Sequence, residues 1–296
     1  MSSGVYQIRK AKKKMGMRTK NALVNGGIYA VLIVLGILWI LPILYLLYTA
    51  LRVTPETGII VKLVPDDLQL GFGNFARLFR ETKFLRWLGN TFLVSVTSCI
   101  ITTLFILMVS YALSRMRFKA RKPIMNVLLV LGMFPGFMSM IAVYFILKAV
   151  GLTNSLLALI LVYSSGAALS YYICKGFFDT IPRSLEEAAI LDGANQATIL
   201  FRVTMPLAKP VIVYTVLTTF IAPWCDFIFV NTIINDVNKY TVSLGLYNLV
   251  NAEYSSFNEN FTMFCAGAVI VGVIVGGLFL SMQRYYVEGV TSGSVK

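Results

Sequence analysis

The chain has 296 residues, of which 57% are hydrophobic and only 13% are charged, and its formal net charge is +13. Soluble domains carry about 25% charged residues, so this composition excludes an ordinary soluble protein and indicates a membrane protein. The basic residues gather in short segments beside apolar ones, which is the pattern of membrane topology rather than of nucleic-acid binding. The chain contains no histidine, which excludes imidazole catalysis and histidine metal sites. We expect neither a nucleic-acid partner nor a cofactor.

Six apolar segments follow one another along the chain. Windows 21–51, 87–114, 123–147, 149–174 and 260–283 contain no Asp, Glu, Lys or Arg, and 210–235 contains only Asp226. A helix needs roughly 20 apolar residues to cross a bilayer, and backbone in lipid must bond within itself. The sequence therefore predicts an all-α membrane protein with six spans, at about 26–48, 91–113, 125–147, 155–174, 210–231 and 262–283. Pro42, Pro135 and Pro223 each permit a kink.

The flanking segments complete a one-domain organisation. Residues 1–25 form a basic N-terminal arm, 26–283 form the six-span domain, and 284–296 form a C-terminal tail. The four segments on one side of the predicted spans hold 18 of the 26 Lys and Arg residues, and the three on the other side hold 8. The positive-inside rule therefore places both termini in the cytoplasm.

The inner segment 175–209 has a helical pattern of its own. Ser184 is a good N-cap after Pro182, and Glu187 stands three residues later, which predicts a capping box. Asp192-Gly193 ends this helix, because glycine accepts the left-handed conformation that follows many helices.

A second short helix is expected from Asn195 to about Met205, where Pro206 stops it. Ala188 and Ala189 leave the first helix with a face that a partner can approach closely. The neighbouring carboxylates can bind an arginine of that partner. The 175–209 segment is therefore predicted to be a docking element.

The same residues carry a resemblance to a known family. Glu187-Ala188-Ala189, Gly193 and the run Val203-Thr204-Met205-Pro206 have the order and spacing of the "EAA" loop of ABC-importer permeases. Three further stretches are similar to sugar permeases of this kind: Asn90-Thr91 and its approach, 151–155 and the tail from Gln283. A fourth, 236–241, is most similar to the MalG-type subunit of maltose and maltodextrin importers. Two departures are Cys225, where these permeases often have Asn, and the missing final Gly.

The resemblance implies a transport subunit and not an enzyme. Such a permease pairs with a MalF-like second permease, two copies of a MalK-like cytoplasmic ATPase, and an extracellular sugar-binding protein. Its cargo would be maltose, maltodextrin or a related oligosaccharide, moved inward. The chain has no G-x-x-x-x-G-K-[ST] motif, so the nucleotide site is expected in the ATPase subunit.

The resemblance also assigns residues to the contact with the ATPase. The docking set is Glu186, Glu187, Ala188, Ala189, Leu191, Asp192, Gly193, Ala194 and Pro206. The tail residues Gly289, Thr291, Gly293, Val295 and Lys296 are expected to reach the same partner. Two plainer interpretations stay open: Glu187 only completes a capping box, and the tail is frayed.

A second candidate site surrounds Asp226, the one ionisable residue well inside a predicted span. Acidic groups in membranes are functional candidates. With Trp224, Phe227 and Tyr163 it is assigned to a translocation path. The alternatives are a polar clasp for Asp226, and helix packing or an interfacial belt for the aromatic residues. A secondary transporter or channel remains the rival class, and a membrane-embedded enzyme is a third.

Overall fold

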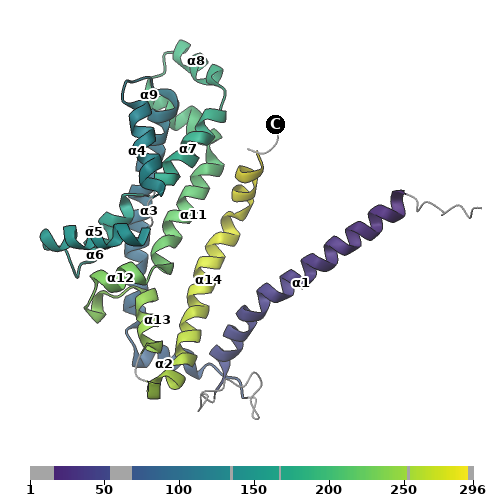
Figure 1. The fold of residues 1–296 in the computed structure, drawn as a ribbon, viewed down its shortest axis with the longest axis vertical. Coiled ribbons are helices and arrows are strands. Elements are labelled where there is room, and N and C mark those ends of the chain that lie inside the picture. The colour runs from purple at the N-terminus through teal and green to yellow at the C-terminus, as the bar shows by residue number, and fades with distance from the viewer. Residues whose placement is uncertain (1–16, 54–68, 134–135, 167, 252–253, 293–296) are drawn as a thin grey trace, which may run out of the picture. The chain divides into compact units, whose positions relative to one another are not determined.

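The computed structural model describes residues 17–53, 69–133, 136–166, 168–251 and 254–292. The chain divides into two compact units, Met1–Tyr48 and Thr49–Lys296. The regular structure of the described residues is helical, with one isolated bridge between Arg52 and Leu70 (Figure 1). The all-α architecture predicted from composition is confirmed for these residues.

The first unit consists of one helix as far as the described residues go. Helix α1 (Met17–Leu51) begins earlier than the predicted residue 26 and contains Pro42 without ending there. Its apolar part, Val24–Leu51, is long enough to cross a membrane. The first predicted span is therefore present as a continuous helix.

The second unit is organised around helix α3 (Phe84–Arg115), which packs against α6 (Leu156–Ser164), α7 (Ala168–Thr180) and α11 (Lys209–Cys225). Helix α14 (Tyr254–Ser292) packs against α11 and α13 (Val242–Val250). The buried face of α3 carries small hydroxyl side chains. Thr102 Oγ1 donates to the Tyr163 main-chain oxygen at 2.9 Å, and Ser110 Oγ donates to that of Tyr171 at 3.0 Å. Small residues and interhelical hydrogen bonds are how membrane helices associate.

The third predicted span, 125–147, is not one straight helix. Helix α4 (Arg121–Met133) and helix α5 (Gly136–Ala149) differ in direction by 103°, and Pro135 lies outside the described residues. The fourth span is interrupted between α6 and α7, where Gly166 has φ +69. A Cβ on Gly166 would lie 3.1 Å from Thr102 Cγ2, so the interruption also brings the chain close to α3. Helix α7 then continues to Thr180, beyond the predicted end at residue 174.

The fifth predicted span, 210–231, ends early. Helix α11 contains Pro223 and stops at Cys225, because Asp226 has extended backbone angles (φ −90, ψ 104), and the chain resumes as α12 (Ile228–Ile233). Helices 196–207 and 209–225 also meet at 85°. In the described residues, four helical stretches are long and apolar enough to cross a membrane if α6 and α7 count as the one stretch Leu156–Thr180, or six if each bent pair also forms one span.

The remaining short elements gather at the two ends of α3 (Figure 1). Helix α2 (Gly73–Glu81), the 3-10 turn η2 (Val237–Lys239) and α13 lie toward the N-terminal end of α3. The elements of the 175–209 segment lie at the other end: α8 (Arg183–Leu191), α9 (Gln196–Thr198), the π-helical turn η1 (Ile199–Thr204) and α10 (Met205–Leu207).

The buried apolar residues of the second unit include two separate clusters. The first contains Val94, Leu159, Val230 and Leu244, and the second contains Ile106, Leu107, Phe178 and Leu200, among others. The second cluster lies beneath the 175–209 segment because Leu200 belongs to η1. That segment is therefore anchored by apolar burial as well as by its two covalent connections.

Candidate functional site

Helix α8 begins two residues before the position that the sequence suggested, since its N-cap is Pro182 and not Ser184. No side chain caps this end of the helix. Ser184 is thus inside the helix at its second position, and the predicted capping box with Glu187 is wrong. The reason is that the Pro182 ring fixes its φ, at −59, and with ψ 129 this residue takes the extended conformation of an N-cap, so the helix starts at Arg183.

The end of α8 agrees with prediction. Gly193 has φ +81, its N–H donates to the Ile190 oxygen at 2.9 Å, and the Ala194 N–H donates to the Ala189 oxygen at 2.9 Å. This pair of hydrogen bonds is a Schellman motif, which satisfies the last carbonyl groups of the helix. No atom outside the local chain lies within 4 Å of a Cβ built on Gly193. The glycine is therefore required by the backbone conformation and not by lack of space.

The second helical stretch starts as predicted and ends differently. Asn195 Oδ1 accepts the Thr198 N–H at 2.8 Å, which confirms its capping role. The chain then forms the π-helical turn η1, and Pro206 is a residue of α10 instead of its stop. The proline is tolerated because its missing N–H falls in the first turn of α10. The turn comes at Ala208, with φ −93 and ψ 12.

Three large apolar residues of α8 are exposed although α8 lies outside every candidate span. Leu185, Ile190 and Leu191 are exposed, and Leu191 is 88% exposed. The other predicted docking residues on this surface are exposed or half-buried: Glu187, Ala188, Asp192, Gly193 and Pro206 are exposed, and Ala189 and Ala194 are half-buried. An apolar surface with acidic residues beside it is typical of a protein-binding site.

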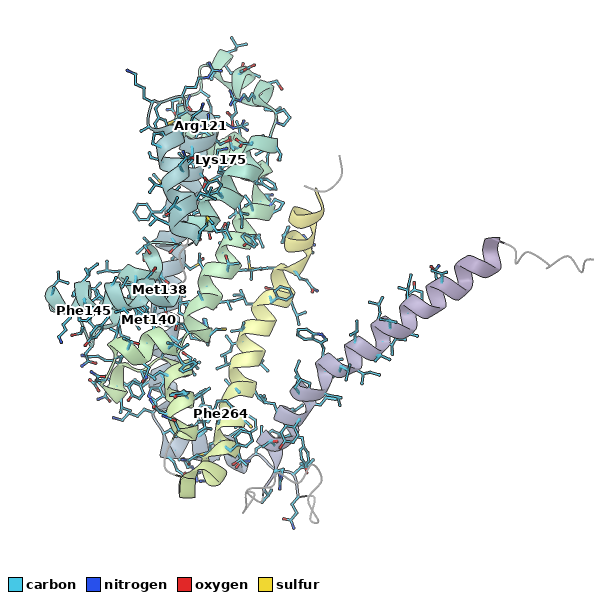
Figure 2. All side chains as sticks on the ribbon, viewed as in Figure 1. Arg121, Met138, Met140, Phe145, Lys175 and Phe264 are labelled. Carbon is cyan, nitrogen blue, oxygen red and sulfur yellow. The ribbon has the colours of Figure 1, made fainter. Side chains whose placement is uncertain are left out.

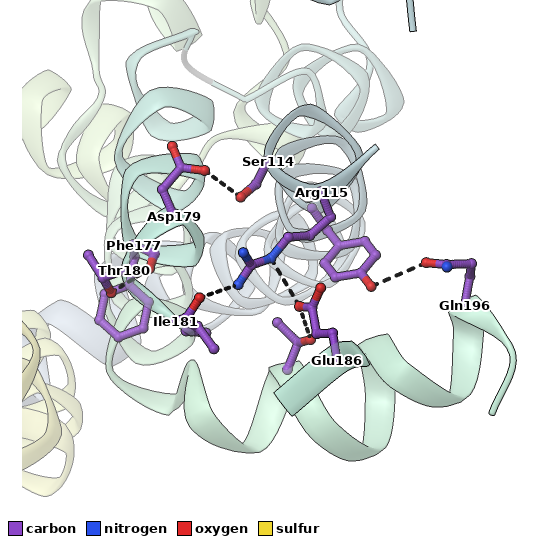
Figure 3. A network of polar contacts seen from close by, with 10 residues as sticks. Ser114, Arg115, Phe177, Asp179, Thr180, Ile181, Glu186 and Gln196 are labelled. Carbon is purple, nitrogen blue, oxygen red and sulfur yellow. Dashed lines mark hydrogen bonds and ion pairs between the residues drawn. The ribbon is translucent and has the colours of Figure 1, made fainter. Parts of the chain in front are cut away.

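Glu186 faces the opposite way from its neighbour Glu187. It is 8% exposed, and its Oε1 atom lies 3.0 Å from Nε of Arg115, the last residue of α3. Thr204 Oγ1 donates to the same carboxylate oxygen at 3.0 Å. Arg115 also donates from Nη2 to the Ile181 main-chain oxygen at 2.8 Å, as Figure 3 shows. The structure thus separates Glu186 from the outward-facing residues of the docking set.

Two neighbours of Arg115 extend this polar network (Figure 3). Ser114 Oγ donates to Asp179 Oδ1 at 2.6 Å, and Lys175 Nζ lies 2.5 Å from Asp179 Oδ2. Tyr111 donates to Gln196 Oε1 at 3.4 Å. Figure 2 places Lys175 at the end of the second unit that carries α8. The last turn of α3 therefore contacts both helices of the 175–209 segment and the end of α7.

The site around Asp226 is a junction of helices. Tyr163 donates to Asp226 Oδ2 at 2.9 Å, the Phe229 N–H donates to Oδ1 at 3.0 Å, and Ser243 Oγ donates to the main-chain oxygen at 2.9 Å. Asp226 thereby joins α6, α12 and α13 at the point where α11 ends. These contacts are those expected if Asp226 is a polar clasp between helices, one of the two roles that its sequence position allows.

The other aromatic candidates near Asp226 contact further rings. The ring of Phe227 stacks on Tyr247 with centroids 4.5 Å apart. Trp224 is buried against Phe92, edge to face, with centroids 4.9 Å apart. The structure therefore brings Tyr163 to Asp226 and gives Trp224 and Phe227 packing partners elsewhere.

A third site, which the sequence analysis treated only as points of resemblance, lies at the opposite end of α3. Asn90 Nδ2 donates to the main-chain oxygens of Asn238 and Tyr240, both at 2.9 Å. Trp87 Nε1 donates to the Val237 oxygen at 3.0 Å. Thr91 Oγ1 accepts the first N–H of α13 at 2.8 Å. The start of α3 thus holds the 237–242 stretch along its length.

Asn154 holds the same stretch from the other side. With φ +57, it accepts the N–H groups of Asn235 and Asp236 at Oδ1, at 3.2 and 3.1 Å, and its main-chain oxygen accepts Lys239 Nζ at 2.8 Å. The Asn238 N–H, donating to the Asp236 carboxylate, lowers the pKa of Asp236 below its usual value. The signal that could have revealed this site was present, since three of the resembling stretches meet here.

The C-terminal tail is only partly described. Gly289 and Thr291 belong to α14, which continues to Ser292, beyond Tyr285, where its candidate span ends. Gly293, Val295 and Lys296 lie outside the described residues, so their predicted contact with an ATPase stays a prediction. Among the residues that the structure describes, no group of three or more Cys, Asp or Glu side chains is placed to hold a metal ion.

The packed apolar helices, four to six of them long enough to cross a bilayer, define a multi-pass membrane protein. Residues 104–289 match the family described as "Binding-protein-dependent transport system inner membrane component". The chain belongs to this family of membrane permease components.

Named relatives agree with this assignment. The chain is 33% identical over 229 residues to the galactooligosaccharides transport system permease protein GanQ of Bacillus subtilis, covering 76% of this chain and 80% of GanQ. It is 30% identical to the maltodextrin permease MalD of Streptococcus pneumoniae, covering 95% and 98% of the two chains. It is 32% identical to MalG of Escherichia coli over 72% of each. The resemblance to permeases of maltose and maltodextrin importers is confirmed.

Solved structures share the fold. A chain of a bacterial ABC transporter involved in the import of the polysaccharide alginate superposes with a TM-score of 0.76 at 21% identity, covering 90% of this chain and 98% of that one. A chain of the MetNI methionine ABC transporter gives a TM-score of 0.54 at 18% identity, covering 74% and 99%. At these identities the likeness concerns the fold.

Proposed function

We propose that this chain is the permease subunit through which a binding-protein-dependent ABC importer moves an oligosaccharide of the maltodextrin type into the cell. The support is that MalD, a permease named for maltodextrin, aligns over nearly the whole of both chains. The partners are a second, homologous permease, two copies of a cytoplasmic ATPase subunit, and an extracellular sugar-binding protein.

The cargo is tested by uptake. Cells with and without this chain are supplied with labelled maltodextrins, galactooligosaccharides and alginate oligomers, and the sugar taken up is measured. We expect loss of maltodextrin uptake in the cells that lack it. Unchanged uptake of every sugar would refute a role in sugar import, and uptake that needs no ATP would favour a secondary transporter instead.

The proposed topology has six spans with both termini and the 175–209 segment in the cytoplasm. It treats α4 and α5 as one bent span, keeps 196–207 outside the membrane and starts the fifth span near Lys209, and it rests on the excess of basic residues in the inner segments. Phe118→Cys should be labelled only from the cytoplasmic side and Ser255→Cys only from outside. Labelling of both positions from one side would contradict this arrangement.

Coupling to ATP hydrolysis is assigned to the 175–209 segment. The observation that carries this proposal is the exposure of Leu185, Ile190 and Leu191 on a helix outside the candidate spans, with Leu191 88% exposed. Apolar side chains exposed to water are stabilised when a partner covers them. Glu187 and Asp192 beside it can bind basic residues of the ATPase.

The docking role is tested with Gly193→Trp and Glu187→Lys. Neither residue lies in a candidate span, so the chain should reach the membrane at near-normal levels while transport is lost and the ATPase detaches or is uncoupled. Gly176→Ala is the matched control, because Gly176 is an exposed helical glycine with nothing within 4 Å of an added Cβ. Normal transport by Gly193→Trp with the ATPase bound would exclude this segment as the coupling element.

The tail is proposed as a second, smaller contact with the ATPase. Its support is that α14 continues as a helix beyond the end of its candidate span. Removing residues 289–296 should weaken co-purification of the ATPase without preventing membrane insertion. Unchanged co-purification and transport would leave the tail without this role.

A further inference from the structure

Two adjacent glutamates at the start of α8 have opposite surroundings. Glu187 is exposed, whereas Glu186 is 8% exposed and faces Arg115 at the end of α3. The side chains of the pair Arg115 and Glu186 are 6% and 11% exposed. Removing one partner of such a buried ion pair destabilises the fold strongly, because the other charge remains buried and unpaired.

The pair joins elements that are far apart in the sequence. The 175–209 segment is covalently continuous with α7 and α11. Ser114 and Tyr111 of α3 contact Asp179 and Gln196 of this segment. Arg115 adds the contact with α8, because its guanidinium reaches Glu186 as well as the Ile181 main-chain oxygen. Helix α3 in turn packs against α6, α7 and α11, so this contact connects α8 to the central helix of the unit.

The same carboxylate also restrains the π-helical turn. Thr204, the last residue of η1, donates its hydroxyl to Glu186 Oε1 at 3.0 Å and is itself fully buried. One carboxylate oxygen thus links α8, the end of η1 and α3. π-helical turns are rare and are frequent at functional positions.

We propose that Glu186 is a positioning residue for transport, which fixes α8 to α3 through Arg115 and Thr204 so that movement of the docked ATPase reaches the membrane helices. This inference rests on the proposed docking function of the 175–209 segment and adds a division of labour to it. Glu187 faces the partner, and Glu186 transmits the partner's movement inward. Loss of Glu187 then weakens binding of the ATPase, whereas loss of Glu186 leaves binding and breaks transmission.

The test compares Glu186→Gln with Glu187→Gln in the assembled transporter reconstituted in liposomes. Three quantities are measured: ATPase subunit retained on purification, ATP hydrolysed, and maltodextrin taken up per ATP. For Glu186→Gln we expect the ATPase to be retained and uptake per ATP to fall about threefold or more, within the range of coupling changes that single residues produce. For Glu187→Gln we expect less ATPase to be retained.

A milder variant covers the case in which Glu186→Gln does not assemble. Thr204→Val keeps the ion pair and the side-chain shape but removes the hydroxyl that holds the carboxylate. It should lower uptake per ATP in the same direction by a smaller factor. Uptake per ATP equal to that of the unmodified chain in Thr204→Val, or in an assembled Glu186→Gln transporter, would overturn the inference.

A distance measurement separates transmission from simple stability. Spin labels on Phe118→Cys and Arg183→Cys, in a chain whose four native cysteines are replaced, report the separation between the end of α3 and the start of α8. We expect one narrow distance that persists through ATP binding, and a broadened or shifted one in Glu186→Gln. Equal distributions in both chains would also overturn the inference. Failure of the unmodified chain to retain any ATPase would instead overturn the proposed function.

Discussion

Gly245→Ala tests how closely α13 approaches the start of α3. A Cβ on Gly245 would lie 2.2 Å from Cε3 and 2.4 Å from Cδ2 of Trp87, which is much closer than real Cβ atoms come. The indole cannot easily move aside, since it is 5% exposed and its Nε1 donates to the Val237 oxygen. The substitution therefore has to displace α13, the indole or both.

The expected cost combines three terms. Forcing an extra methyl group into a packed contact costs about 1–3 kcal/mol, and weakening the indole hydrogen bond costs about 1 kcal/mol. Replacing glycine by alanine inside a helix returns up to about 1 kcal/mol. The net loss is about 2 kcal/mol, which for a chain of 296 residues lowers the unfolding temperature by about 3 °C.

The assay is thermal unfolding of the purified chain in detergent, followed by tryptophan fluorescence. Gly89→Ala is the matched control, because Gly89 is an exposed glycine of α3 with nothing within 4 Å of an added Cβ. Its unfolding temperature should be equal to that of the unmodified chain or slightly higher. A Gly245→Ala chain that unfolds at the same temperature as this control would refute the close contact with Trp87.

Three further changes address the polar contacts. Thr91→Val removes the acceptor of a buried main-chain N–H at the start of α13 and should destabilise the chain by about 1–3 kcal/mol in thermal unfolding, whereas Thr91→Ser should not. Asp226→Leu removes the acceptor of the Phe229 N–H and should lower the unfolding temperature more than Asp226→Asn, which keeps one oxygen. Because the Asn238 N–H lowers the pKa of Asp236, the contribution of this carboxylate to stability is present above its unfolded pKa, about 3.9. It is lost as the pH falls through the lower folded value, so Asp236→Asn should flatten the acid limb of a pH–stability curve.

Features fixed by local chemistry could be predicted from the sequence. The Gly193 turn and the Asn195 cap form because a few neighbouring residues satisfy their own main-chain groups, and both were placed correctly. The start of α8 was misplaced because Ser184 and Pro182 both offer a helix start, and the fixed backbone of the proline prevails. The end of a helix can therefore be predicted from local residues only where no second residue nearby offers a competing start or stop.

Features fixed by packing could not be predicted in the same way. An apolar run has the same composition whether its helix is straight or interrupted, so the end at Ser164 left little trace in the sequence, whereas Pro223 indicated a kink close to the end at Cys225. In the sequence, Arg115 is one of the basic residues that indicate orientation, and nothing near it indicates a partner. Its pairing with Glu186 depends on a tertiary contact across a long stretch of chain.

The interruptions within the predicted spans restrict which surfaces lipid can touch. Where a helix breaks at the depth of the acyl chains, several carbonyl and N–H groups lose their helical partners, and hydrocarbon offers none in return. The gap between α6 and α7 and the stretch around Asp226 therefore belong against protein or hydrated surface. Helix α14 has no such break through its apolar length, so its backbone can face acyl chains without loss. Continuity of the backbone thus distinguishes α14, which can contact lipid along its apolar length, from the interrupted helices, whose breaks need protein or water beside them.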